Sequence, residues 1–103
     1  MLNFLKKIFK KNNEHLQFGS TFGVLHGQFV GELFVYIEEQ DNVLYFLSVP
    51  NMKTREVPRE KYEYGLKSGV IEYVERLPRN ERMVCKAQFQ QNKTVTNEQQ
   101  TTN

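Results

Sequence analysis

Residues 19–37 read GSTFGVLHGQFVGELFVYI, and this stretch decides the fold. Within it, glycine recurs at four-residue intervals, at Gly19, Gly23, Gly27 and Gly31, and the densest apolar run of the chain follows at once. Side chains along a strand alternate between the two faces of a sheet, so this even spacing places all four glycines on one face. A face without side chains lets another element or a ligand approach the backbone closely. We expect packing glycines here, and a ligand groove is the alternative.

The residues around this stretch predict an antiparallel sheet. Residues 16–26 and 28–38 have the composition of two strands, with a reversal at His26-Gly27, where glycine permits a tight turn. Both faces are apolar around residues 33–37, which is typical of a central strand that is covered on both sides. Three further strands are expected at residues 43–49, 52–57 and 70–77, and the polar composition of 52–57 suits an edge.

Three segments favour helix. Residues 58–67 begin with Pro58, which suits a first helical position, and Gly69 suits a C-terminal cap. Residues 81–90 alternate as a strand would, but their composition favours a helix over residues 80–91, and both interpretations stay open. Residues 1–13 predict a short basic amphipathic helix with its apolar side chains in one arc.

These elements define an α+β protein. Its core is a strongly curved antiparallel sheet of four or five strands, with an N-terminal, an internal and a C-terminal helix. A small open barrel is the alternative arrangement. We expect one domain at residues 14–91, preceded by the helix at 1–13. The polar residues 92–103 lack apolar side chains, which predicts a disordered tail.

Composition restricts the classes of function. The chain has 103 residues, a net charge of +2 and a single cysteine, Cys85. One cysteine excludes an intramolecular disulfide and suits a reducing compartment. The longest apolar run is far shorter than the roughly 20 residues that cross a bilayer. We therefore expect a cytoplasmic protein.

Chemical motifs are missing from the sequence. The strongest metal ligands, His15, His26 and Cys85, match no zinc spacing. The glycine series lacks both the GxGxxG spacing and the GK[ST] ending of phosphate-binding loops. No nucleophile, base and acid are brought together by spacing. The sequence thus predicts no catalytic residue, no metal site, no cofactor and no enzymatic activity.

The favoured function is a non-enzymatic protein-interaction module, in a small accessory or regulatory protein. Residues 1–11 carry four lysines and six apolar residues, too short a segment to hold a stable helix alone. Its apolar arc must therefore dock on something, and the partner-binding candidates are Leu5, Ile8 and Phe9. They would contact this domain, a second copy or a partner protein.

Two other functions remain open. The basic segments 53–61 and 76–86 could follow the phosphates of a nucleic acid, and the candidate residues there are Arg76, Arg79, Arg82 and Lys86. Residues 1–11 could instead attach to a membrane surface, because basic amphipathic segments bind anionic lipid.

Overall fold

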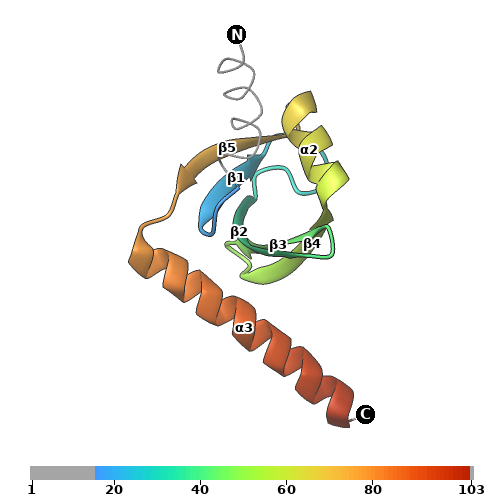
Figure 1. Cartoon of the computed structure of the whole chain (residues 1–103), viewed down its shortest axis with the longest axis vertical. Coiled ribbons are helices and arrows are strands. Elements are labelled where there is room, and N and C mark those ends of the chain that lie inside the picture. The colour runs from blue at the N-terminus through green and yellow to red at the C-terminus, as the bar shows by residue number, and fades with distance from the viewer. Residues whose placement is uncertain (1–15, 103) are drawn as a thin grey trace.

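The computed structural model describes residues 16–102 and shows one antiparallel sheet with two helices (Figure 1). The strands are β1 (Ser20–Val24), β2 (Leu33–Gln40), β3 (Val43–Val49), β4 (Lys53–Pro58) and β5 (Ile71–Arg76), and the helices are α2 (Arg59–Ser68) and α3 (Arg79–Thr102). The strand order is β4-β3-β2-β1-β5, so the predicted α+β class and the five-stranded antiparallel sheet are confirmed. The predicted helix at residues 1–13, with Leu5, Ile8 and Phe9, lies outside the described residues.

Strand β2 is central and is buried on both faces, as its sequence predicts. Phe34 and Tyr36 belong to one apolar cluster, on the concave face, together with Tyr62 of α2. Val35 and Ile37 belong to a second cluster, on the convex face, which α3 covers. The sheet curls so that α2 lies between its two edge strands, β4 and β5, while α3 crosses the outside (Figure 1). Neighbouring side chains of β2 therefore point to opposite faces of the sheet, and this one strand contributes to both apolar clusters.

The glycine series does not form one face of a strand pair, which corrects the prediction. Only Gly23 lies in a strand, because β1 ends at Val24 and residues 25–32 form a loop. Gly27 and Gly31 lie in this loop with φ of +97° and +89°, and a Cβ on either would meet nothing within 4 Å. Left-handed backbone breaks the alternation on which the argument from spacing depends. These glycines allow the loop to turn, and they do not leave one face of the sheet without side chains.

Strand β4 and helix α2 confirm their predictions closely. β4 is an edge strand, and its polar side chains suit that place. α2 begins at Arg59, so Pro58, expected at the first helical position, is instead the last residue of β4 and caps the helix. α2 ends at Ser68, and Gly69, with φ of +80°, is the left-handed cap expected there. The short connection brings β5 back to the far edge of the sheet, beside β1.

Segment 81–90 is helical, and α3 continues to Thr102, beyond the predicted end at residue 91. The tail 92–103, for which the sequence predicts disorder, thus lies in the helix through Thr102. Cys85 and Phe89 pack on the sheet four residues apart, as one helical face requires. Asn92, on the same side, donates from Nδ2 to the carbonyl oxygen of Met52 at 3.0 Å. A helix that is already nucleated extends at little cost, so polar residues can continue it.

Candidate functional site

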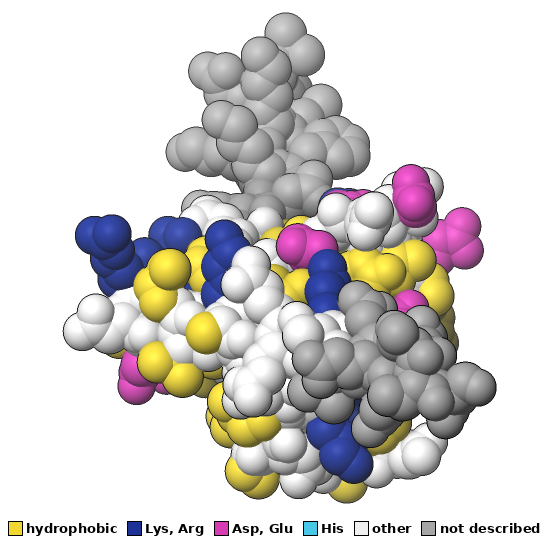
Figure 2. Space-filling model, turned by 90° about the horizontal axis from the view of Figure 1, so that it is seen from below, with side chains coloured by type: hydrophobic (Ala, Val, Ile, Leu, Met, Phe, Trp, Pro, Cys, Tyr) yellow, Lys and Arg dark blue, Asp and Glu magenta, His cyan; other side chains and the backbone are white. Residues whose placement is uncertain are grey.

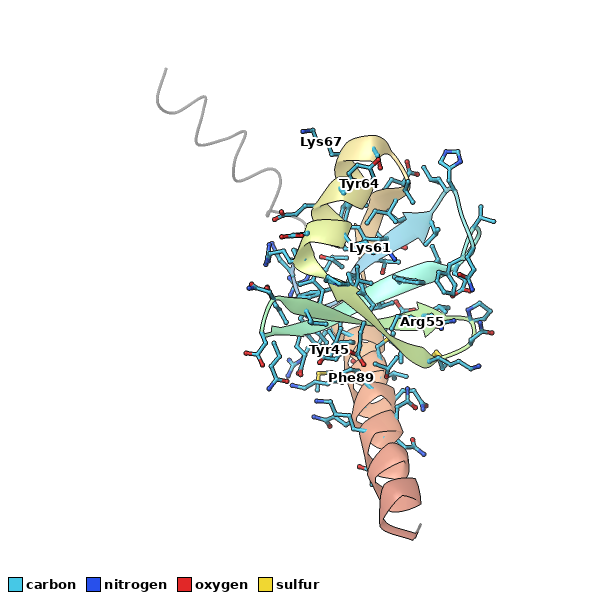
Figure 3. All side chains as sticks on the ribbon, turned by 90° about the vertical axis from the view of Figure 1, so that its right-hand side faces the viewer. Tyr45, Arg55, Lys61, Tyr64, Lys67 and Phe89 are labelled. Carbon is cyan, nitrogen blue, oxygen red and sulfur yellow. The ribbon has the colours of Figure 1, made fainter. Side chains whose placement is uncertain are left out.

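A pocket of about 530 Å³ lies between the loop at residues 25–32, strand β4 and helix α2. Its wall is mostly apolar and aromatic, and the lining side chains of this kind are Val24, Phe29, Phe34, Phe46, Val57, Tyr62, Val70 and Ile71. Figure 3 views the side of the molecule where α2 lies over β4. A concave apolar space with a few polar groups is the usual form of a binding site. We call this space the α2–β4 pocket.

The loop at residues 25–32 forms one wall through Phe29. This ring stacks at a tilt on Phe34, with 6.1 Å between the centroids. Gly27 and Gly31 stand on either side of it, and the carbonyl of Phe29 accepts a hydrogen bond from the N–H of Glu32 at 3.0 Å. The loop thus folds back tightly and presents the ring toward the sheet.

Arg55 brings a charge into the same wall from β4. It lies directly opposite Phe46, so it points toward the concave face. Its Cζ lies 4.6 Å from the centre of the Phe29 ring, a cation–π contact. Its Nη2 lies 3.8 Å from Oε1 of Glu32, and its buried Nε has no hydrogen-bond partner among the described residues. The guanidinium of Arg55 is therefore held in place, while its N–H groups make no hydrogen bond among the described residues.

Arg59, one helical turn from the pocket lining residue Tyr62, behaves differently. Its Nε donates to Oε2 of Glu39 at 2.9 Å, and its Nη2 binds the other oxygen of the same carboxylate. This two-point contact lowers the pKa of Glu39 and raises that of Arg59. The pair fixes the start of α2 to the end of β2, so it is a structural clamp.

Tyr62 packs the N-terminal half of α2 against the concave face of the sheet. It is only 1% exposed, and its ring packs edge-on against Phe22, with 5.5 Å between the centroids. Its hydroxyl has no hydrogen-bond partner among the described residues. Burial raises its pKa from 10.0 to about 12, because the interior disfavours the phenolate.

Replacing Tyr62 with Phe is expected to leave stability at neutral pH unchanged or to raise it by about 1 kcal/mol, because it removes an unpaired buried hydroxyl. The raised pKa adds a second effect. The unfolded chain ionises first, so wild type loses stability between a pH of about 10 and about 12. Denaturant titration at neutral and alkaline pH measures both effects, and Tyr62→Phe should show a shallower alkaline decline. A loss above about 1 kcal/mol at neutral pH would mean that the hydroxyl has a partner.

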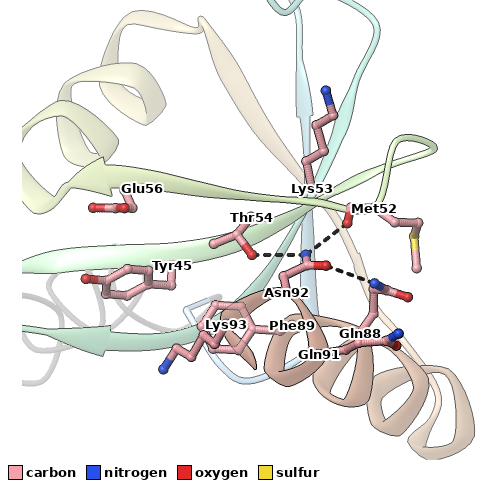
Figure 4. A pocket seen from close by; sticks show the side chains of 10 residues that line it. All are labelled: Tyr45, Met52, Lys53, Thr54, Glu56, Gln88, Phe89, Gln91, Asn92 and Lys93. Carbon is pink, nitrogen blue, oxygen red and sulfur yellow. Dashed lines mark hydrogen bonds between the residues drawn. The ribbon is translucent and has the colours of Figure 1, made fainter. Parts of the chain in front are cut away.

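A second groove, of about 700 Å³, lies between α3 and β4 (Figure 4). Tyr45 and Phe89 lie at its apolar side, with 6.1 Å between their ring centroids. Asn92 crosses it, donating from Nδ2 to Oγ1 of Thr54 at 3.2 Å and accepting at Oδ1 from Gln88 at 2.9 Å. Its central polar groups thus bind one another. The residues of this groove form the contact between α3 and the edge of the sheet.

The predicted nucleic-acid residues lie around the start of α3, and two of them are already engaged. Arg76 donates from Nε to the carbonyl oxygen of Phe18 at 3.0 Å, and Arg82 donates from Nη1 to that of Leu77 at 2.8 Å. Lys86 lies over the ring of Phe18, and Arg79 is exposed. Figure 2 shows several basic side chains close together at the left of the view and others set apart from them, with hydrophobic and uncharged atoms between.

The candidate metal ligands His26 and Cys85 lie in the part of the chain that the structure describes. There, no group of three His, Cys, Asp or Glu residues could hold a metal ion. Cys85 is buried on the side of α3 that faces the sheet, and burial with the nearby charge of Glu81 raises its pKa. Within residues 16–102, no helix combines the length and the apolar character that a membrane crossing needs.

Comparisons with protein-family models, with curated proteins and with solved structures find no match to this chain. Sequence reasoning missed the role of Phe29 because it placed this residue in a strand. It placed Arg55 correctly in the edge strand, but it did not connect Arg55 with Phe29, which is distant in the chain. The available signal was the pair Gly27 and Gly31, which enclose Phe29 in GQFVG and mark a loop as readily as a strand.

Proposed function

We propose that this chain is a non-enzymatic interaction module that captures a segment of a partner protein in the α2–β4 pocket. One observation carries the proposal: an aromatic wall, with Phe29 held over the sheet, adjoins the under-bonded side chain of Arg55. Apolar pockets with a few fixed polar groups bind a side chain through burial and orient it through the polar groups. An aromatic or aliphatic side chain of the partner fits this wall, and such residues dominate protein interfaces.

The N-terminal segment enters the proposal as a second contact. Leu5, Ile8 and Phe9 lie outside the described residues, and their clean separation from the lysines still favours docking on protein. Attachment of residues 1–11 to a membrane surface stays the competing use of this segment. Binding to anionic vesicles that is lost when the four lysines become Gln would favour that use.

Nucleic-acid binding has weaker support as the alternative. Arg59, in segment 53–61, is held by both oxygens of Glu39. Arg76 and Arg82, in segment 76–86, donate to backbone carbonyls. Cations that neutralise phosphates release the counterions condensed on the nucleic acid. Arg59, Arg76 and Arg82 are already engaged within the protein, so they contribute less than their number suggests.

The test is a selection of phage-displayed random dodecapeptides on the full chain, followed by affinity measurement with synthetic fluorescent copies. The chain offers a matched pair of variants in one loop. Phe29 lines the pocket, whereas its neighbour Val30 is 59% exposed and does not line it. We expect Phe29→Ala to weaken binding by about tenfold or more, because an aromatic wall is lost. Val30→Ala should change the affinity less than about twofold.

Two outcomes would contradict this function. One is a selection that enriches no peptide. The other is a set of peptides that bind Phe29→Ala and Val30→Ala equally well, since binding would then occur elsewhere on the molecule. Thermal melts of both variants serve as the control, because both positions lie in the loop at residues 25–32, where truncation should leave the sheet intact.

A further inference from the structure

Two arginines one short segment apart, Arg55 and Arg59, differ in how far the protein satisfies them. Arg59 holds both oxygens of Glu39 and also contacts Glu63 at 3.4 Å. The side chain of Arg55 makes no hydrogen bond among the described residues, and its only ion pair there, with Glu32, spans 3.8 Å. A guanidinium presents five N–H donors in a fixed plane and binds a carboxylate best through two parallel bonds. Arg59 makes this two-point contact with a carboxylate, and Arg55 does not.

The place of Arg55 makes this difference relevant to binding. Its side chain is 28% exposed, so the guanidinium is not sealed inside the domain. The ring of Phe29 supports one face of it, which fixes its plane. Glu32, its weak partner, has a buried Oε1 that also lacks a hydrogen bond among residues 16–102. The pair is therefore loose and adjoins a cavity, whereas the pair of Arg59 with Glu39 is tight.

A second cation faces the same pocket from the other wall. Lys61, on the first turns of α2, lines the pocket and makes none of the ion pairs found among the described residues. Figure 3 shows Lys61 on α2 and Arg55 on β4 on one side of the molecule. Glu56, the acid nearest in the chain, lies opposite Tyr45, which packs toward α3 on the convex face. Its side chain thus starts from the face of β4 opposite to that of Arg55, although Glu56 is also among the residues that line the pocket.

From this arrangement we infer that the partner segment carries a carboxylate beside its apolar anchor, and that Arg55 and Lys61 bind it. This inference rests on the proposed function and names the chemistry of the partner. Arg55 supplies the directional two-point contact, and Lys61 adds a mobile charge from α2. The carboxylate belongs either to an Asp or Glu side chain or to a free C-terminus, since both present the same two oxygens.

The test uses a second matched pair of variants, both on α2. Lys61 lines the pocket, and Lys67, six residues further along the helix, does not. Both side chains are labelled in Figure 3. Each is changed to Glu, and affinity is measured with the fluorescent peptides selected on the wild-type chain. We expect K61E to weaken binding by about five- to tenfold and K67E by less than about twofold, because an attraction becomes a repulsion only at the pocket.

Three further measurements use the same peptides. Changing the acidic residue of the peptide to Lys should restore its affinity for K61E. Amidating the peptide C-terminus separates the two sources of carboxylate, since only a C-terminal contact is lost by amidation. Arg55→Lys keeps the charge but removes the planar guanidinium. This variant should lose more affinity for the acidic peptide than for a copy of that peptide in which the acidic residue is replaced by Gln.

The outcomes separate the two proposals. If Phe29→Ala abolishes binding while K61E and K67E behave alike, the pocket binds protein but the carboxylate inference is overturned. If Phe29→Ala has no effect, the proposed function itself fails. A single-stranded DNA dodecamer that displaces the peptide from wild type, but binds K61E weakly, would identify phosphate as the anion and would also overturn the carboxylate assignment.

Discussion

Replacing Phe46 with Ala is expected to lower the free energy of unfolding by about 3–5 kcal/mol, the cost of truncating a buried aromatic side chain. Phe46 is only 2% exposed and lies at the centre of the concave face. Its ring lies within 6.3 Å, centroid to centroid, of four other aromatic rings, those of Phe22, Phe34, Tyr36 and Tyr62. Small domains have about 5–15 kcal/mol of stability in total, so this change removes a large part of it.

Chemical denaturation followed by circular dichroism measures the loss. Tyr64→Ala is the control, because Tyr64 lies on α2 with 69% of its surface exposed, and truncation there should cost less than about 0.5 kcal/mol. A loss below about 1 kcal/mol for Phe46→Ala would mean that the concave face can collapse around the missing ring. The α2–β4 pocket, which Phe46 also lines, would then lose its fixed wall.

Phe89→Ala is expected to cost about as much, roughly 3–5 kcal/mol, on the opposite face of the sheet. Phe89 is 1% exposed and inserts from α3 into the convex cluster with Val35 and Leu47. Lys93 on the next turn lies over its ring, with Nζ 4.7 Å from the centroid. Without this ring, α3 keeps Cys85 and the hydrogen bonds of Asn92 as its main attachments.

Hydrogen exchange distinguishes a detached helix from general unfolding. We expect the amides of α3 to lose protection before those of β2 and β3, because the helix depends on this one layer. Val84→Ala is the control on the same helix, since Val84 is 62% exposed. If Phe89→Ala lowers the protection of every element equally, α3 and the sheet form a single cooperative unit. If protection and stability both stay at wild-type levels, Phe89 does not hold the helix.

The layered architecture explains how a chain of this size can carry a pocket. The convex cluster and the concave cluster share β2 and β3, so the sheet is supported from both sides. The α2–β4 pocket lies on the concave face, and Phe34, Phe46 and Tyr62 of that cluster line it.

The sequence by itself determined the α+β class, the central strand and the order of elements. Those features follow from local patterns. Residues 33–37 are apolar at both odd and even positions, Pro58 and Gly69 flank α2, and β4 has a polar composition. Each is a property of residues close together in the chain, where strand alternation and capping act directly.

Only the tertiary structure decided what the spaced glycines do, how segment 81–90 folds and where the pocket lies. Gly27 and Gly31 have left-handed backbone, which a spacing cannot reveal, since glycine adopts either hand at similar cost. Segment 81–90 is a helix because Cys85 and Phe89 meet the convex face at helical spacing, and a sheet had to be present to receive them. The contact of Arg55 with Phe29 joins two segments that are distant in the chain and adjacent only once the sheet curls. Register and curvature are properties of the paired strands together, and no single segment encodes them.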